Sequence, residues 1–193
     1  ALLRLQAEGA KLVVTVDCGI SAHAPLTAVH EAGLDVIVVD HHVAEPALPP
    51  AVAVVNPNRL DDDSPHKQLA AVGVAFLLVV ALNRELRRRG YFEARDEPDL
   101  LRWLDLVALG TVCDVVPLTG LNRALVSQGL KRMTARANCG LAALADVARA
   151  EGPPSAYHAG FLLGPRVNAG GRVGEADMGA RLLTTADPDV SRE

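Results

Sequence analysis

Short apolar runs alternate with helical patterns in the first part of this chain. Residues 11–16 (KLVVTV), 36–39 (VIVV) and 51–55 (AVAVV) are short, largely apolar runs rich in β-branched residues. Runs of this kind are typical of strands buried on both faces. Residues 21–32 have helical spacing and end at Gly33, which is a common signal for the end of a helix. The order strand, helix, strand, strand predicts a parallel sheet with crossover helices.

Helical patterns dominate the rest of the chain after a polar break at residues 59–65 (RLDDDSP). Residues 69–89 form a long apolar stretch with a basic tail, which suits the negative end of a helix dipole. Residues 91–98 form a polar connection. Further helices are predicted at residues 100–109, 121–135, 140–150, 155–163 and 177–186. We therefore predict an α/β fold, in which a Rossmann-like parallel sheet is followed by a mostly helical region.

Composition narrows the class of protein. Half of the 193 residues are hydrophobic, but only 3% are aromatic, which is typical of α/β and helical cores built from Ala, Val and Leu. No apolar run approaches the roughly 18–20 residues of a membrane span, so no membrane association is expected. The three cysteines contain no CxxC pair, which argues against a disulfide framework or a thiolate zinc site and favours a cytoplasmic location. The net charge of −4 argues against a simple DNA-binding module, but not against an enzyme with an acidic metal site.

Acidic and imidazole side chains follow the predicted strands. Asp17 ends the first strand in VTVDCGIS, Asp40-His41-His42 follows the second, and Asp114 lies in GTVCDVVP. Ligands bind outside the carboxyl ends of parallel strands, where Asp17 and Asp40 fall. The apolar neighbours of each Asp predict burial, and a buried carboxylate requires a cation or several hydrogen-bond donors. No Lys or Arg is adjacent, so the pattern favours a shared divalent cation: Mn²⁺, Fe²⁺ or Zn²⁺, or Mg²⁺ if carboxylates dominate.

Each of these residues also has a simpler interpretation. Asp17 can serve a turn before Gly19, and Asp40 can cap the end of its strand. Asp114, which precedes Val-Val-Pro, is compatible with an ordinary turn. The set as a whole favours the metal site more than any single member does.

A glycine-rich segment at residues 164–174 (GPRVNAGGRVG) is a second candidate site. Glycines let the backbone approach a ligand closely, and guanidinium groups bind phosphate bidentately. Arg166 and Arg172 are therefore predicted phosphate contacts, with Asn168 as a hydrogen-bonding orienter. The alternative is a glycine-rich turn between domains with solvated arginines. The segment lacks the GK[ST] of a Walker loop.

Four segments in this order, VTVDCGIS, VVDHHV, GTVCDVVPLTGLNR and GPRVNAGGR, resemble the DHH phosphoesterase superfamily. The last two are similar to its branch of RecJ-type single-stranded-DNA-specific exonucleases. The resemblance implies a 5′–3′ exonuclease of DNA repair and recombination, with two divalent cations, Mn²⁺ or Mg²⁺, and single-stranded DNA as substrate. In the full-length context it also implies a helicase or a single-strand-binding protein as partner.

The resemblance also implies a role for each matching residue. Asp17 would bridge two metal ions, while His41 and Asp114 would be further metal ligands. His42 would lie near the scissile phosphate, and Asp40 would orient the site. Three residues would line the path of the nucleic acid: Arg166, Asn168 and Arg172.

The family pattern is incomplete in this sequence. The resemblance implies an Asp-x-Asp motif before residue 12 and a DHHA1 domain at the other end, and neither is present. The segment also reads Asn-Ala-Gly-Gly-Arg where Asn-Ala-Ala-Gly-Arg is usual. We therefore expect an internal fragment that is inactive or nearly so alone, with residues 1–118 in the DHH catalytic domain and residues 119–193 as its helical remainder.

Two other functions stay open on the sequence. One is a DHH-type phosphoesterase that acts on short oligonucleotides or cyclic dinucleotides. The other is a non-catalytic nucleic-acid-binding scaffold that kept the fold. The intact Asp and His set argues against the scaffold, because buried charges without a metal ion would destabilise it.

Overall fold

The computed structural model describes residues 1–173 and 175–191, without the side chains of residues 171–173. Contacts divide the chain into two compact units, Ala1–Glu93 and Ala94–Glu193, and each is described by itself. The predicted boundary after residue 118 concerned family domains and stays a prediction. No helix in the described part of the chain is both long and apolar enough to cross a membrane.

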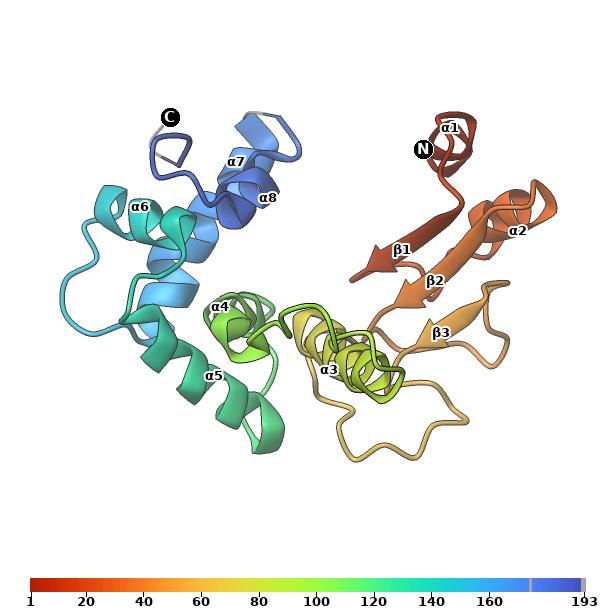
Figure 1. Cartoon of the computed structure of the whole chain (residues 1–193), viewed down its shortest axis with the longest axis horizontal. Coiled ribbons are helices and arrows are strands. Elements are labelled where there is room, and N and C mark those ends of the chain that lie inside the picture. Colours follow the sequence, from red (N-terminus) through yellow and green to blue (C-terminus); the bar gives the residue numbers. More distant parts are fainter. Residues whose placement is uncertain (174, 192–193) are drawn as a thin grey trace. The chain divides into compact units, whose positions relative to one another are not determined.

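The first unit contains a three-stranded parallel sheet in the order β1 (Leu12–Val16), β2 (Asp35–Val39), β3 (Ala53–Val55). Figure 1 shows the three arrows running in the same direction. Val39 is the register partner of both Val16 and Val55, so all three strands end at the same level. The residues that follow them therefore meet at one edge of the sheet.

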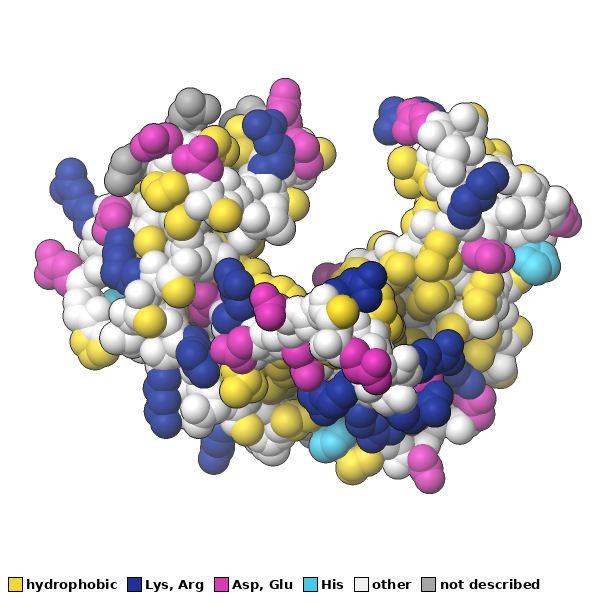
Figure 2. Space-filling model, viewed as in Figure 1, with side chains coloured by type: hydrophobic (Ala, Val, Ile, Leu, Met, Phe, Trp, Pro, Cys, Tyr) yellow, Lys and Arg dark blue, Asp and Glu magenta, His cyan; other side chains and the backbone are white. Residues whose placement is uncertain are grey.

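Three helices accompany this sheet: α1 (Leu2–Ala7), α2 (His23–Glu31) and α3 (Ala71–Arg88). The apolar face of α2 packs on β2, and the core of the unit consists of five buried residues: Leu26, Val29, Leu34, Val36 and Val38. The predicted basic tail is confirmed in the last turn of α3, and Figure 2 shows Lys and Arg side chains gathered over this region. The α/β fold class is confirmed.

Strand β1 departs from the prediction of burial on both faces. Its residues alternate, with Leu12, Val14 and Val16 each about half exposed. The cause is its position, because β1 is an edge strand of the described sheet, whereas β2 lies between two neighbours and is largely buried. An apolar run in the sequence does not distinguish an edge strand from a central one.

The second unit is helical, as predicted. Its elements are η1 (Leu100–Trp103), α4 (Leu104–Cys113), α5 (Gly120–Met133), α6 (Cys139–Val147), the π-helical η2 (His158–Leu163), α7 (Gly164–Val173) and α8 (Met178–Thr184). Helices α4 and α5 pack closely because Gly129 has no side chain, and a Cβ there would collide with the backbone of Leu104. The core joins α4, α5, α6 and η2 through six buried residues: Leu109, Met133, Leu141, Leu144, Ala159 and Leu163.

The glycine-rich segment is a helix rather than the ligand-cradling loop or interdomain turn expected from its sequence. Residues 164–173 form α7, which continues directly from η2. Pro165 has no N–H for the usual helical hydrogen bond, and the wider π-helical turn before it accommodates this loss. A Cβ on Gly164 would collide with Cys113, so at least this glycine serves the packing of the helix against α4.

Candidate metal centre

Asp17 follows β1 in a backbone conformation that is uncommon for residues other than glycine. Its φ is +63°, in the left-handed region that Asp tolerates better than most residues. The Asp17 N–H donates to the Val39 carbonyl at 3.0 Å, which extends the pairing of β1 with β2 by one residue. The side chain is 58% exposed at the end of the strand. The sheet thus fixes the backbone and leaves the carboxylate free to meet a ligand.

Asp40 is the buried member of the group, with 1% exposure. Its Oδ2 accepts from the Ile20 N–H at 3.0 Å, and its Oδ1 accepts from the N–H groups of His41 and His42 at 2.8 and 3.2 Å. Burial is the largest single influence and raises the pKa of Asp40, but the hydrogen bonds from Ile20, His42 and His41 outweigh it and lower the pKa below its ordinary value. Asp40 is therefore an ionised anchor for the loop.

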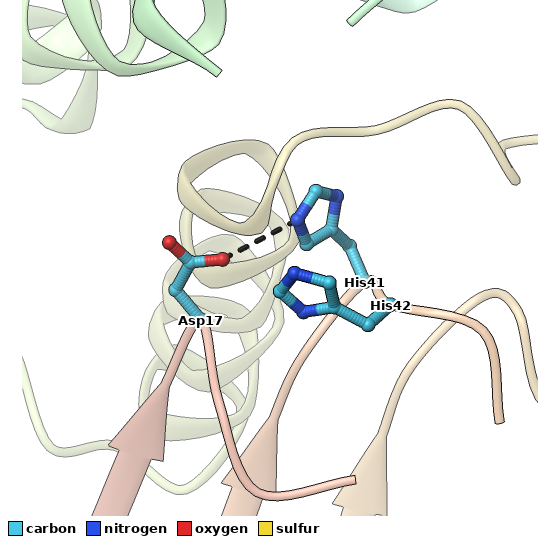
Figure 3. Close-up of side chains that lie close together, drawn as sticks. All are labelled: Asp17, His41 and His42. Carbon is cyan, nitrogen blue, oxygen red and sulfur yellow. Dashed lines mark ion pairs between the residues drawn. The ribbon is translucent and has the colours of Figure 1, made fainter. Parts of the chain in front are cut away.

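His41 is oriented by a backbone carbonyl. Its Nδ1 lies 3.0 Å from the Leu69 oxygen, and since a carbonyl can only accept, Nδ1 carries the proton. In the neutral ring, Nε2 is then the acceptor, and it lies 3.3 Å from Asp17 Oδ1. Figure 3 shows this nitrogen pointing at the carboxylate. Two acceptors that face each other repel unless the ring is protonated or a cation lies between them.

His42 is oriented in the same way by the buried carboxylate. Its Nδ1 lies 2.7 Å from Asp40 Oδ1, so that Nδ1 donates and Nε2 is turned away. The rings of His41 and His42 meet edge to face, with centroids 4.6 Å apart. Three potential ligand atoms, one each from Asp17, His41 and His42, lie within 4.8 Å of one another (Figure 3).

This donor set fits a divalent metal ion. A carboxylate oxygen and imidazole nitrogens suit Mn²⁺, Fe²⁺ and Zn²⁺. Histidines that bind metal usually donate their other ring N–H to a carbonyl or a carboxylate, as His41 and His42 do here. The close approach of Asp17 Oδ1 to His41 Nε2 is the position at which a bound cation would relieve repulsion.

Two asparagines that sequence reasoning overlooked hold the loop of the histidines. The buried Asn56 donates from Nδ2 to the His42 carbonyl at 2.9 Å, and its Oδ1 accepts from the Asn58 N–H at 2.7 Å. Asn58 donates to the His41 carbonyl at 2.5 Å. The available signal was Asn-Pro-Asn at the end of the third strand, next to the other strand ends.

Burial was predicted for all three aspartates, and this is wrong for two of them. Asp40 is buried, but Asp17 and Asp114 are exposed, because each projects from the end of its element. Asp114 caps the end of α4, and its N–H donates to the Gly110 carbonyl at 2.9 Å. It belongs to the second unit, whereas the Asp17, His41 and His42 group lies in the first.

The predicted phosphate contacts all fall on α7 in the second unit. Arg166 and Asn168 are exposed, and Arg166 Nη1 donates to the Leu162 carbonyl one turn back at 2.7 Å. Arg172 lies in the same helix, but its side chain is outside the described part of the structure. These roles stay predictions.

The arrangement of aspartate and histidines at the strand ends agrees with a known family. The model of the DHH family, N-terminal domain, matches residues 3–111. The chain belongs to the DHH family. Among similar DHH proteins are the single-stranded-DNA-specific exonuclease RecJ of Dickeya dadantii, 49% identical over 185 residues, and that of Escherichia coli, 48% identical over 181 residues.

These relatives are longer than this DHH chain. The two alignments cover 94% and 92% of the chain, but 32% and 31% of the relatives. The chain therefore spans about a third of the length of the curated relatives it matches. Two further proteins are similar at 29% identity. They are a putative prophage-derived single-strand DNA-specific exonuclease of Bacillus subtilis and a putative single-strand DNA-specific exonuclease of Bacillus phage SPbeta.

Solved structures agree with the fold. A crystal structure of exonuclease RecJ bound to manganese matches with a TM-score of 0.81 and 40% identity, covering 98% of this chain and 46% of that chain. RecJ from Thermus thermophilus in complex with Mn²⁺ matches with a TM-score of 0.82 and 40% identity, covering 98% of this chain and 27% of that chain. The resemblance to the RecJ-type branch is thus confirmed.

Proposed function

We propose that this chain forms the metal-binding core of a RecJ-type 5′–3′ exonuclease that hydrolyses phosphodiester bonds of single-stranded DNA. One observation carries the proposal: Asp17, His41 and His42 converge, and the Nδ1 atom of each histidine is oriented, by the Leu69 carbonyl for His41 and by the Asp40 carboxylate for His42. The names of the similar proteins support the substrate class. The site would hold two divalent cations, Mn²⁺ or Mg²⁺, because similar RecJ structures contain manganese or Mg²⁺.

Each residue would have a distinct task in this reaction. Asp17 and His41 would hold metal, and Asp114 would complete the coordination of one ion. Bound divalent ions would supply a water of lowered pKa and positive charge for the phosphate. Asp40 would position His42, which would lie near the scissile phosphate and stabilise the charge that develops on its oxygens.

The path of the DNA would lie along α7. Arg166 and Arg172 would contact phosphates, and Asn168 would orient the backbone, since guanidinium groups pair well with phosphate oxygens. Val115, next to Asp114, supports a functional role for the end of α4, because its φ of +59° is strained for a β-branched residue. In the cell the protein would act in DNA repair and recombination in the cytoplasm, with a helicase or a single-strand-binding protein as partner.

Metal binding is tested first on this chain by calorimetric titration with Mn²⁺. We expect saturable binding, and at least tenfold weaker binding for Asp17→Asn and for His41→Ala. The matched control is His30→Ala, because His30 is an exposed histidine on α2, away from the strand ends. Equal affinities for all four proteins, or no binding to the unmodified chain, would contradict the proposal and favour a non-catalytic scaffold.

Nuclease activity is tested on this sequence within a chain of the length of its relatives. We expect Mn²⁺-dependent release of nucleotides from the 5′ end of long single-stranded DNA, and loss of release with His41→Ala. Hydrolysis of dinucleotides or cyclic dinucleotides without attack on long DNA would identify the alternative phosphoesterase instead. The Arg149→Ala variant serves as a control for the loss of an exposed arginine outside the proposed path.

A further inference from the structure

A cavity of about 340 Å³ lies within the second unit, in a part of the chain that takes no role in the proposed metal chemistry. Its walls come mainly from apolar side chains: Met133, Leu141, Ala145, Pro153, Pro154 and Leu163. Engineered apolar cavities of about 150 Å³ hold benzene, and ligand pockets begin at about 300 Å³. The cavity is therefore large enough for a molecule with one ring and a short substituent.

The carboxylate of Asp105 is the unusual component of this wall. Asp105 is only 3% exposed, and it lines the cavity from the first turn of α4. Its Oδ1 accepts from the N–H of the next residue, Leu106, at 2.7 Å. Within the described part of the chain, no Lys, Arg or His forms an ion pair with it, and Arg102 acts only as a minor, distant charge. A buried carboxylate in this state is costly and favours a cationic partner.

The basic groups of the same wall are already engaged. Arg136 donates from Nη2 to the Ala142 carbonyl at 2.9 Å and to Asp146 at 2.7 Å. His158 accepts at Nδ1 from the Ser155 N–H, which leaves its Nε2–H to donate to a backbone carbonyl. Neither side chain compensates Asp105, so the cavity combines an apolar interior with one unbalanced negative group.

We propose that this cavity binds a compact organic ammonium ion, whose apolar body fills the space between the walls and whose N–H groups donate to the Asp105 carboxylate. Shape alone would admit a neutral apolar molecule as well. The carboxylate adds the selection for positive charge, because a charge-assisted hydrogen bond in an apolar site is stronger than a neutral one. The same group disfavours carboxylate and phosphate ligands.

The experiment is an NMR titration of the 193-residue chain with benzylamine, which is protonated at neutral pH, and with benzyl alcohol, its neutral counterpart of nearly the same shape. We expect shifts centred on residues that line the cavity, and a dissociation constant for benzylamine at least tenfold below that for benzyl alcohol. Asp105→Asn should abolish this preference. Ala145→Leu, which fills the cavity and keeps the carboxylate, should weaken both probes.

Three results would overturn the proposal: no binding of either probe, equal binding of both, or an unchanged preference in Asp105→Asn. Asp63→Asn is the control, because Asp63 is an exposed carboxylate in the first unit and should leave both titrations unchanged. Circular dichroism of each variant verifies that it is folded. If Asp105→Asn fails to fold, the charge preference of the unmodified chain and the weaker binding of both probes to Ala145→Leu still decide the question.

Discussion

Asp40 Oδ1 lies 2.7 Å from Nδ1 of His42, and the same oxygen accepts the backbone N–H groups of both His41 and His42. One buried carboxylate oxygen thus fixes the backbone of the two histidines and the ring of one of them. Asp40 therefore holds the DHH segment rigid, although it does not itself face the metal position. Its effect on metal binding should be indirect but large.

Asp40→Asn should weaken Mn²⁺ binding by about 10–100-fold, the range typical of residues that orient metal ligands. The amide keeps the size of the side chain but replaces one acceptor oxygen by a donor, which opposes the donors of Ile20 or the histidines. Calorimetric titration measures the effect, with Asp35→Asn as the control, because Asp35 is an exposed aspartate at the start of β2, the strand that Asp40 follows. An unchanged affinity would show that the loop holds its geometry without Asp40.

Asn56→Ala should destabilise the first unit by about 1–3 kcal/mol, because it leaves the His42 carbonyl and the Asn58 N–H without their buried partner. Urea denaturation measures the free energy of unfolding. Asn168→Ala is the matched control, since Asn168 is exposed on α7 and should change the stability by less than about 0.5 kcal/mol. Equal changes in the free energy of unfolding for the two substitutions would show that Asn56 does not support the site.

Gly19→Ala should disturb the turn that connects Asp17 to α2. Gly19 has a φ of +118°, and a Cβ there would lie 2.8 Å from Thr15 Oγ1 and 3.1 Å from Val38 Cγ1. We expect a loss of about 1–3 kcal/mol in the free energy of unfolding, together with weaker Mn²⁺ binding. Gly9→Ala separates the two causes, because Gly9 also has a positive φ but its Cβ would meet no atom within 4 Å. Equal losses for both variants would assign the effect to backbone strain alone.

Asp105→Asn should stabilise the chain at neutral pH. Burial is the largest influence on Asp105 and raises the pKa of its carboxyl above the ordinary 3.8. The protonated form is therefore favoured in the folded state. The contribution of this carboxyl to the stability of the fold is present below pH 3.8 and is lost as the pH rises through the folded pKa. The stability difference between Asp105→Asn and the unmodified chain should be largest at pH 7 and shrink toward pH 4.

Urea denaturation at several pH values measures this difference. The exposed Asp63→Asn is again the control and should show no comparable trend. A difference that grows toward low pH would contradict the assigned direction. If the cavity holds an organic cation, the Asp105 carboxylate lowers the stability of the folded chain and provides the selection for positive charge. Asp105→Asn should then raise the free energy of unfolding and abolish the preference for positive charge.

The sequence alone determined the order of the elements and named Asp17 and the DHH segment as parts of the candidate site. Apolar runs and helical spacing predicted the three strands and the succeeding helices, because burial imposes these periods on local sequence. The edge of the sheet that carries Asp17 and the DHH segment followed from the parallel topology. The register then brought the ends of β1, β2 and β3 to the same level.

Only the tertiary structure decided the partners that are distant in sequence. The Leu69 carbonyl assigns the proton of His41, and Asn56 and Asn58 hold the loop from the neighbouring strand. Helix α7 formed where glycines suggested a loop, and at Gly164 the lack of a side chain permits close packing against Cys113 of α4. The cavity beside Asp105 also depends on the meeting of separate helices. Such contacts are set by the free energy of packing in three dimensions, which no local pattern encodes.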